Sequence, residues 1–368
     1  MTSTTTGTAS RQEAVLAALA AGVLGPAYDP AVPGRMLEIL GRTASRRDRD
    51  RLLRVLAALD SRAGALALTG RPAPMSGRPA AAAEAAVRRW AEGRLPQRRL
   101  ADALAPVALL AAYAWPGPAR DATGYPGPLG PAPDVPRRLA PLRPDGDEEL
   151  ACDVVVVGSG AGGGVVAAEL ARAGLDVVVL EKGGYAAERD FSHQEGDAYR
   201  DLYLYALTLT TDDLACRIVA GSTLGGGTVV NYTTSFATPP AVLAEWAAVS
   251  GVDAFVSGEV AASLEAVAGR LGVTEDESRP GVRDQLMERG LERLGWHAAP
   301  LPRNVRGCAQ DAGCGWCGFG CRLGAKQSTL VTYLEEAAGA GARLFVDADA
   351  RRVLVEAADP AGRPGSRP

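Results

Sequence analysis

The sequence predicts an α/β protein in which an all-helical N-terminal region precedes a domain built on a parallel sheet. The first third of the chain is rich in Ala, Leu and Arg, with apolar residues at helical spacing. A proline-rich segment then interrupts this pattern. Beyond it, short runs of Val and Leu are separated by helical patterns, which is typical of parallel strands covered on both faces.

The length and composition narrow the function classes. At 368 residues the chain is long enough for two or three domains. The formal net charge of −4 excludes a strongly basic nucleic-acid binder, so we expect no nucleic-acid partner. No apolar stretch reaches the roughly 18 residues of a membrane span, and the N-terminus lacks the pattern of a signal peptide. We therefore expect a cytoplasmic chain.

Residues 1–124 are expected to form the helical region. Prolines separate its apolar segments and predict where the helices end. No catalytic pattern occurs here, so a packing role is the simplest interpretation. One buried helical face is indicated by Leu52, Leu53, Leu56 and Leu59. Helices are expected near residues 11–23, 34–42, 46–60, 80–94 and 98–114.

Residues 125–150 are expected to form a linker. Seven of the twenty residues from Tyr125 to Pro144 are proline, a composition that excludes a helix or a central strand. An acidic cluster then leads into the next domain. The sequence therefore predicts an extended connection between two separately folded parts.

Residues 151–358 are expected to form the α/β domain, and 359–368 a disordered tail. The domain opens with a strand, a helix and a second strand. Helices and two further strands follow, without an internal repeat. The opening elements are expected at Asp153–Val157, Gly163–Ala173 and Val177–Leu180. The later helices are expected near 239–249, 260–271, 282–294 and 329–339, and the later strands at Arg343–Val346 and Arg352–Glu356.

A glycine-rich segment joins the first strand to the first helix of this domain: Gly158-Ser159-Gly160-Ala161-Gly162-Gly163. In this pattern the first glycine allows a tight turn, the second lets the backbone approach a pyrophosphate, and the third lets the helix pack close to the strand. The phosphates would lie at the helix N-terminus, whose N–H groups attract negative charge. A glycine turn without a ligand is the alternative. The complete strand–helix–strand context favours a Rossmann-like nucleotide site.

An acidic residue follows the second strand at the distance expected for a ribose contact. Glu181 lies 23 residues after Gly158 and is suited to accepting hydrogen bonds from ribose hydroxyls. It disfavours a 2′-phosphate because two anions would meet, although the neighbouring Lys182 softens that argument. The motif alone does not separate FAD from NAD.

A second glycine-rich segment lies about sixty residues farther on, from Gly221 to Tyr232 (GSTLGGGTVVNY). A dinucleotide site needs one phosphate-clamping glycine loop, so a second one suggests a cofactor with a further planar part. Glycines let the backbone approach a flat ring, and Asn231 is placed to bond its polar edge. The alternative is a buried glycine turn between strands.

Together, the strand–helix–strand unit and this second segment resemble the glucose–methanol–choline (GMC) oxidoreductase family of FAD enzymes. The segment CGFGCRLGAKQST at residues 317–329 and the helical N-terminal region are similar to the long-chain fatty alcohol oxidase/dehydrogenase branch of that family. The resemblance implies an FAD-binding domain of GMC type. It implies that the pyrophosphate is held by Gly158, Ser159, Gly160, Ala161 and Gly163, and the adenosine ribose by Glu181 with Lys182 beside it. It also implies that the flavin side is lined by Gly221, Ser222, Gly225, Gly226, Asn231 and Tyr232.

The resemblance also implies the chemistry: hydride transfer from an alcohol carbon to flavin N5, turning a long-chain alcohol into an aldehyde. Oxygen or another electron acceptor would take the electrons, and the substrate would bring peripheral lipid contact. The family's base is a His paired with a His or Asn toward the C-terminus. Only His193 and His297 occur here, and neither lies in a matching motif. We therefore expect both to be packing or surface residues, the catalytic residues to lie beyond Pro368, and the C-terminal substrate domain to be absent.

Four cysteines crowd into fourteen positions as C-x5-C-x2-C-x3-C: Cys308, Cys314, Cys317 and Cys321. The last three match part of a ferredoxin pattern, but Arg322 stands where that pattern has proline and the first spacing is too long. Structural zinc sites usually separate two ligand pairs by a longer loop. Reduced thiols, an iron–sulfur cluster, zinc and a disulfide all stay open. Cys152 and Cys216 are expected to be small core residues.

Four functional hypotheses follow. The leading one is the FAD-binding part of a GMC alcohol oxidoreductase, which is not expected to turn over substrate alone. The second is a dehydrogenase that passes electrons from flavin through an iron–sulfur cluster. The third is a non-catalytic flavin-binding fragment. An NAD-dependent dehydrogenase is disfavoured by the second glycine segment.

Overall fold

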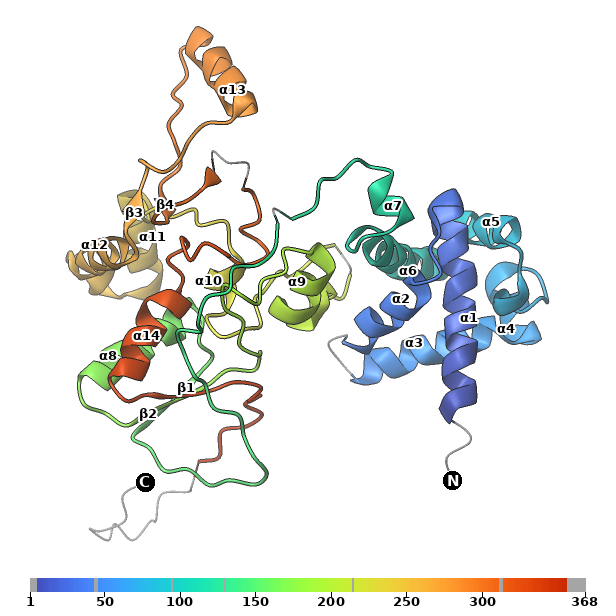
Figure 1. The fold of residues 1–368 in the computed structure, drawn as a ribbon, viewed down its shortest axis with the longest axis horizontal. Helices are drawn as coiled ribbons and strands as arrows, with labels where there is room; N and C mark the ends of the chain where they lie inside the picture. Colours follow the sequence, from blue (N-terminus) through green and yellow to red (C-terminus); the bar gives the residue numbers. More distant parts are fainter. Residues whose placement is uncertain are drawn as a thin grey trace.

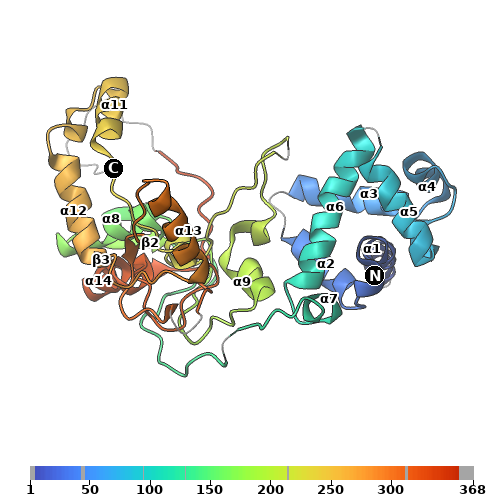
Figure 2. The same ribbon diagram turned by 90° about the horizontal axis from the view of Figure 1, so that it is seen from above.

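A computed structural model describes residues 5–42, 46–93, 95–128, 130–213, 215–310 and 314–355. The helical N-terminal region and the α/β domain lie side by side, and an extended segment joins them (Figures 1 and 2). Within the described residues, no helix is both long and apolar enough to span a bilayer.

The N-terminal helices pack around α1, and their shared core buries Leu16, Met36, Leu56 and Trp90. The five predicted helices are present. A helix between Arg62 and Thr69 was not predicted, although Ser61 accepts a cap hydrogen bond from the N–H of Gly64. The helices are α1 (Thr5–Leu24), α2 (Val32–Gly41), α3 (Arg46–Leu59), α4 (Arg62–Thr69), α5 (Ala80–Ala91), α6 (Leu95–Tyr113) and α7 (Pro118–Asp121).

The second domain is built on three parallel strands in the order β1-β2-β5. Helices α8 and α14 pack against each other and against the sheet through Ala167, Ala171 and Leu334. β2 is buried, but Val155 and Val157 of β1 are 52% and 62% exposed. The prediction that both faces are covered is therefore wrong for β1, because no described element lies over those two side chains. The elements are β1 (Val154–Val157), α8 (Ala161–Arg172), β2 (Val177–Leu180), α14 (Tyr333–Gly339) and β5 (Arg343–Phe345).

Around the sheet lie short helices and a two-stranded antiparallel ribbon of β3 with β4. The predicted helix at 329–339 is divided: residues 329–331 form a 3-10 turn, and α14 starts after Thr332. Residues 351–355 form no strand, so the predicted strand at Arg352–Glu356 is wrong there. Glu356 and the predicted tail lie outside the described residues. The remaining elements are α9 (Glu195–Leu202), α10 (Gly227–Val230), α11 (Pro240–Ser250), α12 (Glu259–Leu271), β3 (Val273–Thr274), α13 (Val282–Arg293) and β4 (Arg303–Asn304).

The proline-rich linker is extended, as predicted, and it packs on the α/β domain. Leu142 forms a parallel bridge with Phe345 at the edge of the sheet, where its N–H donates to the carbonyl of Leu344 at 2.8 Å. Farther back, Arg137 pairs with Asp190 at 2.8 Å. The prolines are tolerated because this position is an edge.

Helix α9 joins the two domains (Figure 1). The N–H of Gly196 donates to the carbonyl of Ala114 at 2.8 Å, and the Trp115 indole donates to Asp197 at 3.1 Å. A Cβ on Gly196 would lie 2.0 Å from the Trp115 ring, so only glycine permits this approach. The helical region is thus held against the α/β domain by directed contacts.

Candidate functional site

The first glycine segment forms the turn between β1 and α8. Gly158 has a φ of +88°, which favours glycine. A Cβ on Gly163 would lie 1.9 Å from the carbonyl oxygen of Gly158, so this glycine is required for the strand and helix to pack. Gly160 is the N-cap of α8, and the N–H of Gly164 donates to its carbonyl at 2.8 Å. The N–H groups of the first turn, from Ala161 on, have no intrahelical acceptor and favour an anion.

The Glu181 carboxylate at the end of β2 is buried against this turn. It accepts hydrogen bonds from the Ser159 N–H at 3.1 Å and the Ser159 hydroxyl at 2.6 Å. The N–H of Gly183 donates to its other oxygen at 2.8 Å. Three donors use three of the roughly four lone-pair positions of a carboxylate, which leaves room for one ribose hydroxyl. Glu181 therefore has a structural role that the sequence did not indicate.

The second glycine segment lies directly against the first. The N–H of Gly225 donates to the hydroxyl of Ser159 at 2.9 Å. Gly226 has a φ of +55°, and a Cβ on it would lie 2.8 Å from the Cα of Gly160. A Cβ on Gly221 would meet the backbone of Gly226 at 2.5 Å. Two segments about sixty residues apart therefore form one surface of bare backbone.

The third segment, residues 317–329, fixes the other two. The hydroxyl of Thr329 lies 3.2 Å from the carbonyl oxygens of both Ser159 and Gly225. The ammonium of Lys326 donates to the carbonyls of Val229 at 2.8 Å and Asn231 at 2.6 Å. Burial lowers the pKa of Lys326 to about 8. All three motifs singled out in the sequence thus converge on one place.

The last two residues of the second segment are open to solvent, and the buried Thr233 that follows them has a strained backbone. Thr233 has a φ of +66°, which is rare for a β-branched residue, and its hydroxyl accepts a hydrogen bond from Arg303 at 3.0 Å. The side-chain oxygen of Asn231 accepts from the Thr233 N–H at 3.2 Å, and Asn231 itself is exposed. Tyr232 is 65% exposed. Backbone strain at a site edge is typical of functional positions.

Two other predicted cofactor residues have partners within the protein. The ammonium of Lys182 donates to the hydroxyl of Tyr205 at 3.0 Å and lies 3.7 Å from Asp349. The N–H of Ser222 donates to the carbonyl of Leu202 at 2.8 Å. Their contacts with a cofactor stay predictions.

The two histidines are packing and surface residues, as expected. His193 is buried, stacks on Trp316 at 5.9 Å between ring centroids, and lies 3.3 Å from the carbonyl of Gly320. Burial, with the nearby Arg322 guanidinium, lowers its pKa to about 4. His297 is exposed.

The four clustered cysteines all line one cavity of about 30 Å³ and carry free thiols. Among the residues that the structure describes, no group of three or more His, Cys, Asp or Glu side chains is arranged to hold a metal ion. Cys152 is half-buried and Cys216 is exposed, so the prediction that Cys216 lies in the core is wrong. Cys216 follows a turn and lies on a bridge-forming loop rather than on an element that faces the core.

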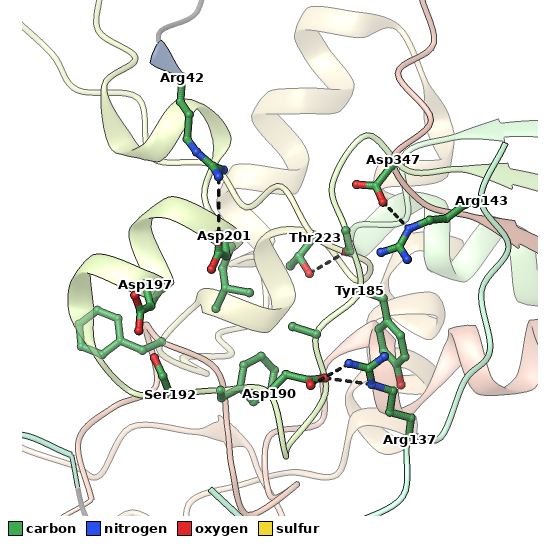
Figure 3. Close-up of a pocket in the computed structure, with 16 residues that line it drawn as sticks. Arg42, Arg137, Arg143, Tyr185, Asp190, Ser192, Asp197, Asp201, Thr223 and Asp347 are labelled. Carbon is green, nitrogen blue, oxygen red and sulfur yellow. Dashed lines mark hydrogen bonds and ion pairs between the residues drawn. The ribbon is translucent and has the colours of Figure 1, made fainter. Parts of the chain in front are cut away.

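A larger pocket of about 420 Å³, which the sequence did not indicate, lies where α9, the linker and the end of α2 meet (Figure 3). Its three arginines each face an aspartate, so their charges are already compensated. No sequence signal connects these distant positions. The pairs are Arg137 with Asp190 at 2.8 Å, Arg143 with Asp347 at 2.7 Å, and Arg42 with Asp201 at 3.9 Å.

A family model for the GMC oxidoreductases matches residues 154–363, more than half of the chain and all three motifs. The chain belongs to the GMC oxidoreductase family. Members of this family are flavoproteins that generally bind FAD.

The curated relatives that are similar to this chain include proteins named long-chain-alcohol oxidases. The chain is 45% identical to the long-chain-alcohol oxidase FAO4B of Arabidopsis thaliana over 217 residues, 58% of this chain and 29% of that protein. It is 41% identical to FAO1 of the same plant over 56% of this chain and 27% of that oxidase. It is 37% identical to the uncharacterised GMC-type oxidoreductase Rv0492c of Mycobacterium tuberculosis over 62% of this chain and 36% of that protein. The chain therefore spans about a third or less of the length of these relatives.

Proposed function

We propose that this chain binds FAD and forms the flavin-binding part of an oxidoreductase that acts on the CH–OH group of a long-chain alcohol. The observation that carries the proposal is the position of the Ser159 hydroxyl. It bonds the Glu181 carboxylate at 2.6 Å and the Gly225 N–H at 2.9 Å, and so joins the ribose side to the flavin side of one continuous surface.

The residues fit the cofactor. The first turn of α8 offers N–H groups to the pyrophosphate, and no atom lies within 4 Å of a Cβ built on Gly158 or Gly162. Glu181 keeps one acceptor position for a ribose hydroxyl. The second segment, which Ser159 joins to Glu181, offers its exposed residues Gly227, Asn231 and Tyr232 to a flat ring. Bound FAD would supply the hydride acceptor for alcohol oxidation. The chain's own residues bind and orient it; the described residues offer no paired base.

The proposed substrate and the proposed electron acceptor are inferred from the names of the relatives. Two relatives with 41% and 45% identity are named long-chain-alcohol oxidases, which supports a long-chain alcohol as substrate and oxygen as acceptor. Peripheral lipid contact through the substrate and a cytoplasmic location are parts of the same proposal. Electron transfer through a metal cluster gains no support, because no described group is arranged to hold metal.

Anaerobic flavin reduction tests the proposal. The purified chain is loaded with FAD, freed of excess, and mixed with a long-chain primary alcohol or with ethanol. We expect the chain to retain FAD, and the flavin to stay oxidised with either alcohol because the described residues offer no paired base. Bleaching by the long-chain alcohol would contradict the assignment of this chain as the flavin-binding part alone, and an absence of bound flavin would contradict the whole proposal.

A further inference from the structure

The cavity between the cysteine-rich loop and β4 brings four thiols together with two cations. Cys308, Cys314, Cys317 and Cys321 all line it. Arg303 and Lys326 line it as well, and both are buried. All four cysteines are partly accessible and free. Nothing in the proposed flavin chemistry uses the four thiols.

One of these thiols lies against a buried cation. The guanidinium of Arg303 donates a hydrogen bond to Cys308 Sγ at 3.4 Å and so places a positive charge beside that sulfur. Burial raises the pKa of Cys317, while Lys326 and Arg303 lower it and the neighbouring Cys321 and Cys308 raise it. Cys308, with the guanidinium against its sulfur, is thus the thiol best placed as a nucleophile, and Cys317 lines the same cavity.

A metal centre gains no support at this cavity. Among the described residues, no group of three or more His, Cys, Asp or Glu side chains is arranged to hold a metal ion. Four free and partly exposed thiols around one cavity are instead susceptible to oxidation.

The cavity is connected to the flavin side of the proposed site through one ammonium group. Lys326 donates to the carbonyl of Cys317 at 2.7 Å and to those of Val229 and Asn231 in the second glycine segment. Next to Cys317, the carbonyl of Gly318 accepts from the Tyr203 hydroxyl at 2.7 Å. A change in the backbone at Cys317 therefore acts directly on the donor that holds the second segment.

We propose that Cys308 and Cys317 form a hydroperoxide-sensitive thiol pair, and that their disulfide loosens the flavin-side segment through Lys326. The Cys308 thiol gives up its proton, its sulfur attacks a peroxide oxygen and the O–O bond breaks. The departing hydroxide takes up that proton, so a sulfenic acid and one water are formed. Cys317 then attacks that sulfur and displaces a second water. Two thiols lose two electrons and two protons, and one peroxide becomes two waters. The link to flavin binding rests on the proposed function; the thiol pair does not.

Peptide mapping tests the pair. The reduced full chain is treated with stoichiometric hydrogen peroxide, alkylated, digested without reductant and analysed by mass spectrometry. We expect a peptide pair joined through Cys308 and Cys317, reversed by dithiothreitol, and lost in both Cys308→Ser and Cys317→Ser. The matched control Cys216→Ser, which removes an exposed thiol elsewhere, should keep the crosslink. A crosslink without Cys308, no crosslink at all, or stoichiometric zinc or iron in the purified chain overturns the proposal.

An FAD titration of the reduced and the oxidised chain tests the coupling. We expect oxidation to weaken FAD binding about tenfold, or about 1.4 kcal/mol, with recovery after reduction and no change in Cys308→Ser. Equal affinity in both states overturns the coupling. If neither state binds FAD, the proposed function fails, while the peptide map still decides the thiol pair.

Discussion

Replacing Ser159 with alanine should remove the side-chain hydrogen bonds that join the two glycine segments and leave the backbone in place. Ser159 is fully buried, and its hydroxyl makes two hydrogen bonds, one to a carboxylate and one from the Gly225 N–H. A hydrogen bond to a charged group is worth about 1.5–3 kcal/mol, and a buried N–H left without an acceptor costs about 1–3 kcal/mol. Because the carboxylate keeps two other donors, we expect a loss of about 3 kcal/mol in the free energy of unfolding.

Urea unfolding of the chain without FAD measures this loss, and an FAD titration measures its effect on binding. Ser263→Ala is the matched control, because that hydroxyl donates to the carbonyl of Glu259 on exposed helix α12 and should cost less than about 0.5 kcal/mol. Glu181→Gln combined with Ser159→Ala should show a coupling energy of about 0.5–3 kcal/mol, as residues in one network do. If Ser159→Ala loses no more free energy of unfolding than the Ser263→Ala control, the claim that Ser159 holds the two segments together is refuted.

Four further changes test the folding and the FAD binding of the chain. Gly160→Val should fold, because a Cβ there meets only the Cα of Gly226 at 3.9 Å, but it should abolish FAD retention by blocking the phosphates. Gly163→Ala should lower the free energy of unfolding by more than about 3 kcal/mol, because its Cβ would lie 1.9 Å from a carbonyl oxygen. The free energy of unfolding should fall by about 1–3 kcal/mol as the pH drops from 6.5 to 4, because His193 takes up its proton at a higher pH in the unfolded chain than in the folded chain. In acid unfolding curves, His193→Gln should remove this loss, whereas the control His297→Gln should keep it. Lys326→Met should lower the free energy of unfolding, measured in urea, by about 3 kcal/mol, because three buried carbonyls lose their donor; an unchanged free energy of unfolding would contradict that role.

The elements around the first glycine segment could be predicted closely because their signals are local. The strand from Val177 to Leu180 was placed to the residue, and the strand at Val154 and the helix before Arg172 within one or two residues. Apolar runs, the glycine turn and the change of period are all visible within about thirty residues. The helix from Arg62 to Thr69 also carried a local signal, its serine cap and the following Gly70, but its short length hid it.

Features that depend on distant contacts could not be predicted. Nothing in either motif shows that Gly226 touches Gly160, or that Ser159 holds Glu181, because the partners lie far apart in the chain. The strand expected at Arg352 failed for the same reason: its apolar residues find no neighbouring strand among those described. Burial of Cys216 was inferred from residue type alone, and local bonding places it on an exposed loop instead.

The central claim is that the two glycine segments form one FAD site, and calorimetric titration of the purified chain with FAD tests it most directly. The account predicts one FAD bound per chain, a yellow protein after gel filtration, and no binding heat for folded Gly160→Val. A correctly folded chain that stays colourless and releases no heat in excess FAD, or a Gly160→Val variant that binds FAD as tightly as the original, would contradict it.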